Sequence, residues 1–252
     1  MSTEYVSSEI HDNIGIITLN NPKSMNSVNE KMLTELAEQV TEYNSNPNVK
    51  VIILKGIEKS FATGIDIKEL ASNIGNARNI IKNMQQKFDI IVNTDKPLIA
   101  VITGFALGIG CEIALACDII LATDNAKFGL PELSIGLLPC FGGCKLLASR
   151  IGKAKALDMI LTGKAMTADE AERAGLISRI VNNTAIIEEY TKIAQRIALL
   201  PEYSISTAKK LVREIIDKPN LEIEKTLCLS HIESGELKKT LLNFANKNSS
   251  ES

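Results

Sequence analysis

The segment from Pro97 to Ala122 constrains the fold more than any other part of the chain, because it is almost entirely apolar. Among the residues that interrupt it are Gly108, Gly110, Glu112 and Asp118. No uninterrupted apolar run therefore reaches the roughly 18–20 residues needed to cross a membrane. The pattern instead predicts a strand, a glycine-containing turn, a helix of small residues and a second strand, over residues 98–102, 104–110, 111–116 and 118–122. This order is typical of α/β proteins with buried sheets.

The same alternation of strands and helices extends over the first half of the chain. We expect strands over 5–10, 14–19 and 49–54, a helix capped by Ser27 that ends near 43, a loop over 61–66, and a helical region that ends near 92. From residue 153 the pattern is mainly helical, with a capping box over 167–170, one strand over 176–181, and helices near 184–199, 201–216, 221–231 and 235–246. The sequence thus predicts an α/β core over residues 1–195 and a C-terminal helical region over residues 196–252.

Composition excludes several classes of protein. Hydrophobic residues make up 45% of the 252 residues, which suffices for a large core, and the net charge of -2 offers no basic surface for nucleic acid. Five cysteines without a CxxC pair, and two histidines distant from them in sequence, argue against a bound metal. The N-terminus lacks the basic and apolar regions of a secretory signal. We expect a soluble, cytoplasmic protein with reduced thiols that binds neither nucleic acid nor membrane.

Two glutamates stand in unusual surroundings. Glu112 lies in a sequence that is otherwise apolar or small, and Glu132 follows Pro131 in a segment bracketed by glycines. Each has an ordinary structural explanation. Glu112 fits an exposed helix edge, and Glu132 fits the first turn of a helix, where the helix dipole favours a negative charge. Neither glutamate, taken alone, indicates a function.

Two glycine-containing turns, residues 63–66 and 107–110, stand where a strand or loop meets the start of a helix. Backbone N–H groups at such positions can bind a ligand oxygen. The second turn suggests a dinucleotide-binding fingerprint, but Ile113 occupies the position of the third required small residue. A serine hydrolase is also disfavoured, because the chain contains no GxSxG sequence.

Taken together and in order, these segments resemble the crotonase (enoyl-CoA hydratase/isomerase) superfamily. The matching segments are Asn20–Ser27, Ser60–Leu70, Lys96–Ala114, Ala116–Ile119, Ala126–Glu132, Leu161–Gly163 and Ala171–Leu176. The likeness covers nearly the whole chain and weakens after about Leu200. Several ordered segments at the family's spacing carry far more weight than any one of them.

The resemblance implies a ββα spiral core with a C-terminal helical region that supports homotrimers or dimers of trimers. It also implies an acyl-CoA substrate, with coenzyme A as part of the substrate and neither a separate cofactor nor a metal. The backbone N–H groups of Ile65 and Ile109 would form an oxyanion hole. The residues that would bind the CoA thioester are Met25, Ala62, Ile65, Asp66, Ile67, Lys68, Ile109 and Cys140, with Lys247 as a candidate for a CoA phosphate.

The resemblance also changes the interpretation of the glutamates, because hydratases of this family typically have both. Addition of water to a C2–C3 double bond takes a proton from water at C3 and delivers one to C2, and two carboxyl groups can divide these tasks. Close together in an apolar pocket, they cannot both ionise easily, so an acid and a base coexist. We expect Glu112 to activate water and Glu132 to handle the proton at C2.

The sequence departs from the hydratase pattern at two places. Isoleucine occupies positions 65 and 109, where the family usually has small residues, and Cys140 and Phe141 precede a glycine pair at which hydratases usually have small residues. The alternatives are an enoyl-CoA isomerase that uses Glu132 alone, a thioester hydrolase with one carboxylate, and a non-catalytic acyl-CoA-binding or RNA-binding protein. The two carboxylates and the slightly acidic charge argue against the last of these.

Overall fold

The computed structural model describes residues 5–217 of the chain. The chain divides into two compact units, Met1–Ala198 and Leu199–Ser252. In the second unit, the described part contains helix α9 (Glu202–Asp217), in agreement with the helix expected near 201–216. The helices expected over 221–231 and 235–246, and Lys247, lie outside the described residues. No helix within residues 5–217 is long and apolar enough to cross a membrane.

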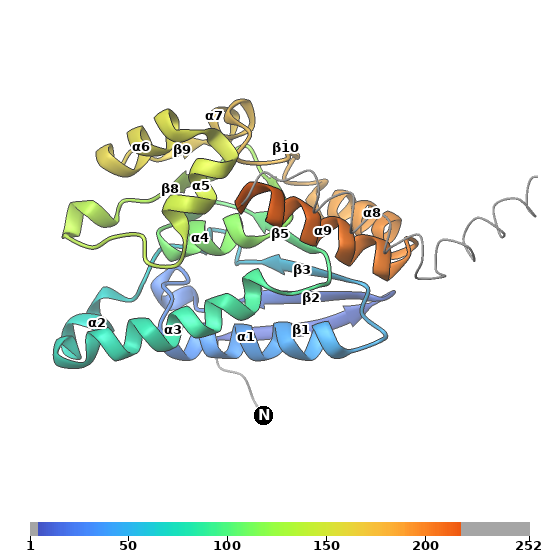
Figure 1. Cartoon of the computed structure of the whole chain (residues 1–252), viewed down its shortest axis with the longest axis horizontal. Helices are drawn as coiled ribbons and strands as arrows, with labels where there is room; N and C mark the ends of the chain where they lie inside the picture. Colours follow the sequence, from blue (N-terminus) through green and yellow to red (C-terminus); the bar gives the residue numbers. More distant parts are fainter. Residues whose placement is uncertain (1–4, 218–252) are drawn as a thin grey trace, which may run out of the picture. The chain divides into compact units, whose positions relative to one another are not determined.

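The first unit alternates strands with helices (Figure 1). Its strands are β1 (Val6–His11), β2 (Ile14–Leu19), β3 (Val51–Lys55), β4 (Ser60–Ala62), β5 (Leu98–Ile102), β6 (Phe105–Leu107), β7 (Ile119–Ala122), β8 (Lys127–Gly129), β9 (Met166–Thr167) and β10 (Arg179–Ile180). Its α-helices are α1 (Glu30–Ser45), α2 (Ile67–Ser72), α3 (Ala77–Val92), α4 (Ile109–Ala116), α5 (Gly143–Ile151), α6 (Lys153–Thr162), α7 (Ala168–Ala174) and α8 (Ile186–Ala198). Three short 3-10 helices are η1 (Pro22–Ser24), η2 (Ile74–Asn76) and η3 (Glu132–Ile135).

The strands form two sheets, and from β3 to β8 successive strands alternate between them. The larger sheet has the order β1-β2-β3-β5-β7-β10 and the smaller sheet has the order β4-β6-β8-β9. Only the pairs β1–β2 and β8–β9 are antiparallel. The chain therefore repeats a unit of one strand in each sheet followed by helix: β3-β4 with α2 and α3, β5-β6 with α4, and β7-β8 with η3, α5 and α6. This arrangement confirms the expected α/β core of ββα spiral type.

Both faces of strands β2, β3, β5 and β7 of the larger sheet are largely buried, whereas β1 at its edge is mostly exposed. On β5, Leu98, Ala100 and Ile102 face the main core with α1, α3 and α4, whereas Ile99 and Val101 face a second core. The second core is closed by α8, which contributes Ile186, Tyr190 and Ala194. This alternation follows from the two-residue period of a strand, and it explains why β5 reads as a continuous apolar run.

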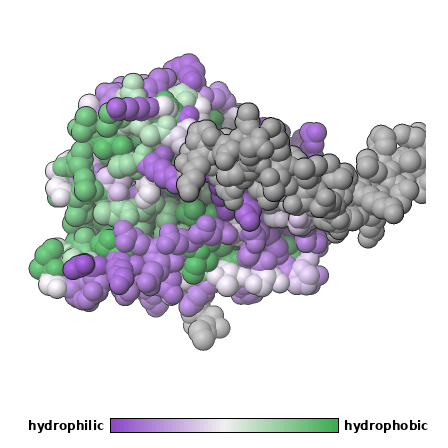
Figure 2. Space-filling model, in the orientation of Figure 1, coloured by the Kyte–Doolittle hydropathy of each residue, from purple (hydrophilic) through white to green (hydrophobic). Residues whose placement is uncertain are grey.

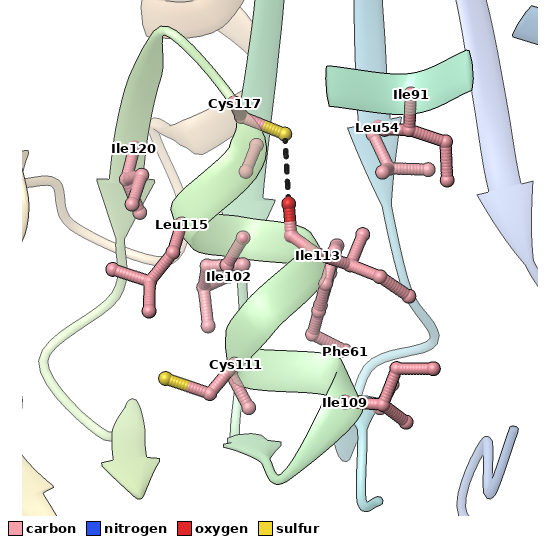
Figure 3. Close-up of a cluster of buried hydrophobic side chains, with 14 of the residues drawn as sticks. Leu54, Phe61, Ile91, Ile102, Ile109, Cys111, Ile113, Leu115, Cys117 and Ile120 are labelled. Carbon is pink, nitrogen blue, oxygen red and sulfur yellow. Dashed lines mark hydrogen bonds between the residues drawn. The ribbon is translucent and has the colours of Figure 1, made fainter. Parts of the chain in front are cut away.

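Helix α4 lies in the middle of the main core, surrounded by side chains of other elements (Figure 3). Gly110 makes this position possible, since a Cβ atom there would lie 2.3 Å from the carbonyl oxygen of Ala62. At the other end of the helix, the guanidinium of Arg150 donates hydrogen bonds to the carbonyl oxygens of Leu115 and Cys117. Those carbonyls lack partners within the helix, so Arg150 satisfies groups that burial would otherwise penalise.

Several expected boundaries were wrong. Helix α1 begins at Glu30 and is capped by Asn29 rather than Ser27, because the Asn29 side chain accepts a hydrogen bond from Met32 N at 2.8 Å. The expected loop over 61–66 overlaps β4, and the expected turn over 104–110 contains β6, both three-residue strands of the smaller sheet. Strands this short carry no detectable period. The strand expected over 176–181 shrinks to β10, whereas the capping box at Thr167 is confirmed.

The packing around α4 yields a stability prediction. Ile113 is fully buried within the cluster of Figure 3, and Ile113→Ala would leave a cavity that the rigid sheets on either side cannot fill. We expect the free energy of unfolding to fall by about 2–5 kcal/mol. Denaturant unfolding measures this loss, with Leu161→Ala, at a side chain that is 68% exposed, as the control. A loss at Ile113 no larger than that of the control would contradict the central position of α4.

Candidate active site

A cavity of about 240 Å³ opens beside the N-terminus of α4. It is bounded by the 63–67 turn, by α3, by the start of α4 and by the segment that runs from η3 to α5. The lining residues are mainly apolar: Thr63, Gly64, Ile65, Ile67, Ile81, Gly108, Ile109, Glu112, Pro131, Glu132, Ser134, Ile135, Leu137, Leu138, Cys140 and Phe141. Apolar surface gathers over α2 and the segment after β8 (Figure 2), where Ile67, Ile135 and Leu138 are exposed.

Two backbone N–H groups stand at the wall of this cavity. Ile109 is the first residue of α4, so its N–H has no partner within the helix. Ile65 forms a parallel β-bridge with Val28. The two hydrogen bonds of this bridge involve the residues on either side of Ile65, since Val28 N donates to Gly64 O and Asp66 N donates to Val28 O. The Ile65 N–H therefore points away from Val28. Within residues 5–217, neither N–H donates to another backbone group.

Glycines bring the two turns together. Gly64 and Gly108 have φ of +108° and +53°, in the region that side chains with a Cβ rarely adopt. A Cβ on Gly108 would lie 3.1 Å from Gly64 Cα and 3.2 Å from Glu132 Oε1. The residues that follow these glycines, Ile65 and Ile109, consequently both line the same cavity.

The isoleucines at these two positions do not obstruct the backbone donors. The side chain of Ile109 is 2% exposed and packs near Phe61 in the core cluster (Figure 3). Ile65 is half-buried and also packs against this core. The bulk that the sequence places at both positions is therefore largely directed into packing.

Glu112 is held through one carboxyl oxygen only. Its Oε1 accepts hydrogen bonds from Phe141 N at 2.9 Å and Gly143 N at 2.8 Å, whereas its buried Oε2 has no partner among the described residues. Gly143 must be glycine for this contact, since a Cβ there would lie 2.7 Å from Oε1. Burial raises the pKa of Glu112 to about 7, the two N–H donors oppose that rise, and the charge of Glu132 adds to it. Near neutral pH both protonation states are populated.

Glu132 begins the 3-10 helix η3, directly after Pro131. Glu132 thus does lie in the first turn of a helical segment, the position that its ordinary structural explanation assumed. Burial raises the pKa of Glu132 above its ordinary value, and its Oε2 is buried with no partner among the described residues. Glu112 and Glu132 thus both line the cavity, and each has one buried oxygen without a partner among the described residues. A buried polar atom without a partner is uncommon in a folded protein and indicates a place for a ligand or water.

The thiols around the cavity are not activated. Burial, followed by the charges of Glu112 and Glu132, raises the pKa of Cys140, and the same causes act on Cys111. A raised pKa keeps each sulfur protonated, and the thiolate is the reactive form. The carboxyl groups are therefore the groups in this cavity that can transfer protons at neutral pH.

The structure brings most of the expected site residues together. Ile65, Ile109, Glu112, Glu132, Ile67 and Cys140 line the cavity. Met25, Ala62, Asp66 and Lys68 do not. Ala62 is buried beneath the start of α4, and the Asp66 carboxylate caps α2 by accepting hydrogen bonds from Lys68 N and Glu69 N. Met25 adopts a left-handed backbone conformation after η1, with 39% of its side chain exposed.

Three contributions to the site were not expected from the sequence. The N–H groups of Phe141 and Gly143 hold Glu112, and Ile81 of α3 forms part of the apolar wall. The glycine pair Gly142-Gly143 was a visible signal, because adjacent glycines indicate a close approach to the backbone. Ile81 has no such signal, since one apolar residue on a helix is ordinary.

The chain is similar to proteins of one family along almost its whole length. Residues 9–251 match the family described as enoyl-CoA hydratase/isomerase. A probable enoyl-CoA hydratase of Rhizobium meliloti is 37% identical over 254 aligned positions, which cover all of this chain and 98% of that protein. A crotonyl-CoA hydratase of Syntrophomonas wolfei is 36% identical over 85% of this chain and 83% of that protein.

Solved structures agree with these sequence similarities. An enoyl-CoA hydratase from Bacillus anthracis superposes with a TM-score of 0.90 at 30% identity, covering 97% of each chain. One from Thermoplasma volcanium gives a TM-score of 0.87 at 29% identity, covering 98% of this chain and 97% of that one. The chain therefore belongs to the enoyl-CoA hydratase/isomerase family, which confirms the resemblance stated above.

The raised pKa of Glu112 has a consequence for stability. The folded state holds its proton more tightly than the unfolded state, where the pKa is about 4.5. The glutamate therefore destabilises the fold progressively as pH rises from about 4.5 to about 7. Relative to wild type, Glu112→Gln should gain up to about 3 kcal/mol in the free energy of unfolding across this window.

Urea unfolding at several pH values measures this gain. Glu38→Gln, on the exposed side of α1, controls for the loss of one charge. A constant difference between Glu112→Gln and wild type from pH 4.5 to pH 8 would show that the carboxyl is not perturbed by burial.

Proposed function

We propose that this protein is an enoyl-CoA hydratase, which adds water across the 2,3 double bond of 2-enoyl-CoA thioesters to give 3-hydroxyacyl-CoA. One observation carries the proposal: two carboxyl groups, each with an unbound buried oxygen, share an apolar cavity with the N–H groups of Ile65 and Ile109. The family membership and the names of the similar proteins support the same activity.

In the proposed complex, the thioester oxygen accepts hydrogen bonds from Ile65 N and Ile109 N. Water then attacks C3, and its proton passes to the free Oε2 of ionised Glu112. The C2–C3 π electrons move toward the thioester, which becomes an enolate with negative charge on its oxygen. Backbone donors fixed in a dry site stabilise such a charge by about 3–4 kcal/mol each.

The second proton comes from Glu132, which is protonated when the substrate binds and gives its proton to C2. A C3–O bond and a C2–H bond have then formed, and the π bond has been lost. Afterwards Glu112 holds a proton and Glu132 does not, so one proton must pass between them or through solvent before the next turnover. Burial raises the pKa of both groups, to about 7 for Glu112, and this favours the exchange.

The CoA moiety is proposed to lie along the 62–68 turn, outside the cavity. Ile67 lines the cavity while Asp66 and Lys68 do not, so the turn extends from the reacting end toward the surface. CoA is part of the substrate, and the chemistry requires no separate cofactor.

The proposal also includes an assembly and a location. The protein would form a homotrimer or a dimer of trimers through the 196–252 region, and it would be cytoplasmic. The four cysteines of residues 5–217 form no disulfide bond with one another, which supports a reducing compartment.

Removal of either proton-transfer group should abolish hydration. We expect Glu112→Gln and Glu132→Gln each to lower kcat for crotonyl-CoA by at least about 10²-fold, because an amide neither accepts nor delivers the proton. Loss of absorbance of the conjugated thioester measures the rate. Glu170→Gln, in the capping box of α7, is a control that leaves the cavity intact. Near-wild-type turnover in either cavity variant would refute the assigned role.

Product identification separates hydration from isomerisation. An isomerase needs one proton shuttle, whereas the cavity presents two carboxyl oxygens without partners. We therefore expect 3-hydroxyacyl-CoA as the product from 2-enoyl-CoA, with one oxygen from H₂¹⁸O in the product by mass spectrometry. A shifted alkene without ¹⁸O would identify an isomerase instead.

A further inference from the structure

The carbonyl of Cys140 receives a hydrogen bond from a residue that does not line the active-site cavity. Gln85 of α3 donates from its Nε2 to Cys140 O at 2.8 Å. This oxygen belongs to the peptide group that joins Cys140 to Phe141. The N–H of the same peptide group is one of the two donors to Glu112 Oε1, at 2.9 Å. A continuous chain of hydrogen bonds therefore runs from Gln85 through one planar peptide to Glu112.

The Cys140–Phe141 peptide lies outside any helix or strand. It lies in the irregular segment between η3 and α5, and Gly142 follows it with a φ of +91°. Phe141 is held by packing against Phe88, one turn along α3 from Gln85, with ring centroids 5.8 Å apart. That contact positions the ring of Phe141, whereas Gln85 acts on the orientation of the peptide plane.

Packing does not explain the choice of residue at position 85. Helix α3 buries Met84, Phe88 and Ile91, while Gln85 and its neighbour Gln86 are exposed. An exposed helix position tolerates almost any polar side chain. The distinguishing property of Gln85 is a neutral N–H donor of the right length to reach the Cys140 carbonyl.

We infer that Gln85 is a positioning residue, which fixes the Cys140–Phe141 peptide so that its N–H stays directed at Glu112 Oε1. The inference rests on the proposed role of Glu112 as the base. Donation to the carbonyl oxygen also polarises the peptide and strengthens its N–H as a donor. Gln85 thereby holds Glu112 through Oε1 and leaves Oε2 directed at the water.

The hydrogen bonds determine whether loss of Gln85 raises or lowers the pKa of Glu112. The Phe141 N–H stabilises the charged form of Glu112 and so lowers its pKa. Loss of Gln85 frees the peptide and weakens that donor, so the pKa of Glu112 should rise. As the base must be ionised, the acidic limb of the pH–kcat/KM profile should move to higher pH.

The test compares Gln85→Met, which keeps the length and removes the donor, with Gln86→Met on the same exposed part of the helix. We expect the acidic limb of Gln85→Met to move up by about 0.3–1 pH unit. Activity at pH 6 should fall by about 2–10-fold and return to near the wild-type value at pH 9. Gln86→Met should leave the profile unchanged. Gln85→Leu serves as a second variant without the donor.

Two results would overturn the inference: a profile of Gln85→Met that coincides with wild type, or a drop by the same factor at every pH. The second result is the signature of a purely structural role. Isotope-edited infrared titration of Glu112 in the same variants supplies a readout that needs no substrate. A higher titration midpoint of Glu112 in Gln85→Met than in wild type supports the inference even if wild type proves to lack hydratase activity. An unchanged midpoint overturns it.

Discussion

A carboxyl group buried at the start of helix α4 and held through only one of its oxygens is the interaction on which the rest of this structure depends. An ionised glutamate at 1% exposure is unfavourable unless backbone donors compensate for lost water. Phe141 N and Gly143 N provide that compensation at Oε1, and nothing among the described residues does so at Oε2. The protein thus maintains a group whose proton is neither tightly held nor fully lost near neutral pH.

Much of the fold serves to place this carboxyl. The larger sheet and α3 enclose α4, Gly110 allows the helix to approach Ala62, and Arg150 binds its last carbonyls. The smaller sheet ends in the turns that present Ile65 N and Ile109 N. Close packing of α4 against Ala62 therefore requires glycine at position 110. The apolar side chains of the same helix exclude water from the carboxyl, so its hydrogen bonds are stronger than they would be in solvent.

The sequence predicted β2, β3, β5 and β7 of the larger sheet well, because each is a mainly apolar run between turn signals. It did not predict β4, β6 and β8, because each of these strands has three residues, which are too few to show the two-residue period of a strand. The cap of α1 was misplaced by two residues because Ser27 and Asn29 are both good caps, and only the Asn29 side chain reaches Met32 N.

Some residues of the candidate site could likewise be predicted from the sequence, and others could not. Glu112, Glu132 and the two backbone donors were identified through ordered motifs, since each glutamate alone had an ordinary structural explanation. The groups that hold Glu112 were missed because they are main-chain N–H groups, which any residue except proline can supply. Gln85 was missed for a different reason: an exposed glutamine on a helix becomes informative only when its partner is seen.

The most direct measurement of the central claim is the ionisation of Glu112 itself. Infrared difference spectra of the substrate-free protein, with Glu112→Gln to assign the carboxyl band, give its titration midpoint without reference to turnover. A midpoint near pH 7 is expected from burial opposed by two backbone donors. A midpoint near 4.5, the ordinary value for glutamate, would mean that the group is hydrated and cannot serve as the poised base of a buried site.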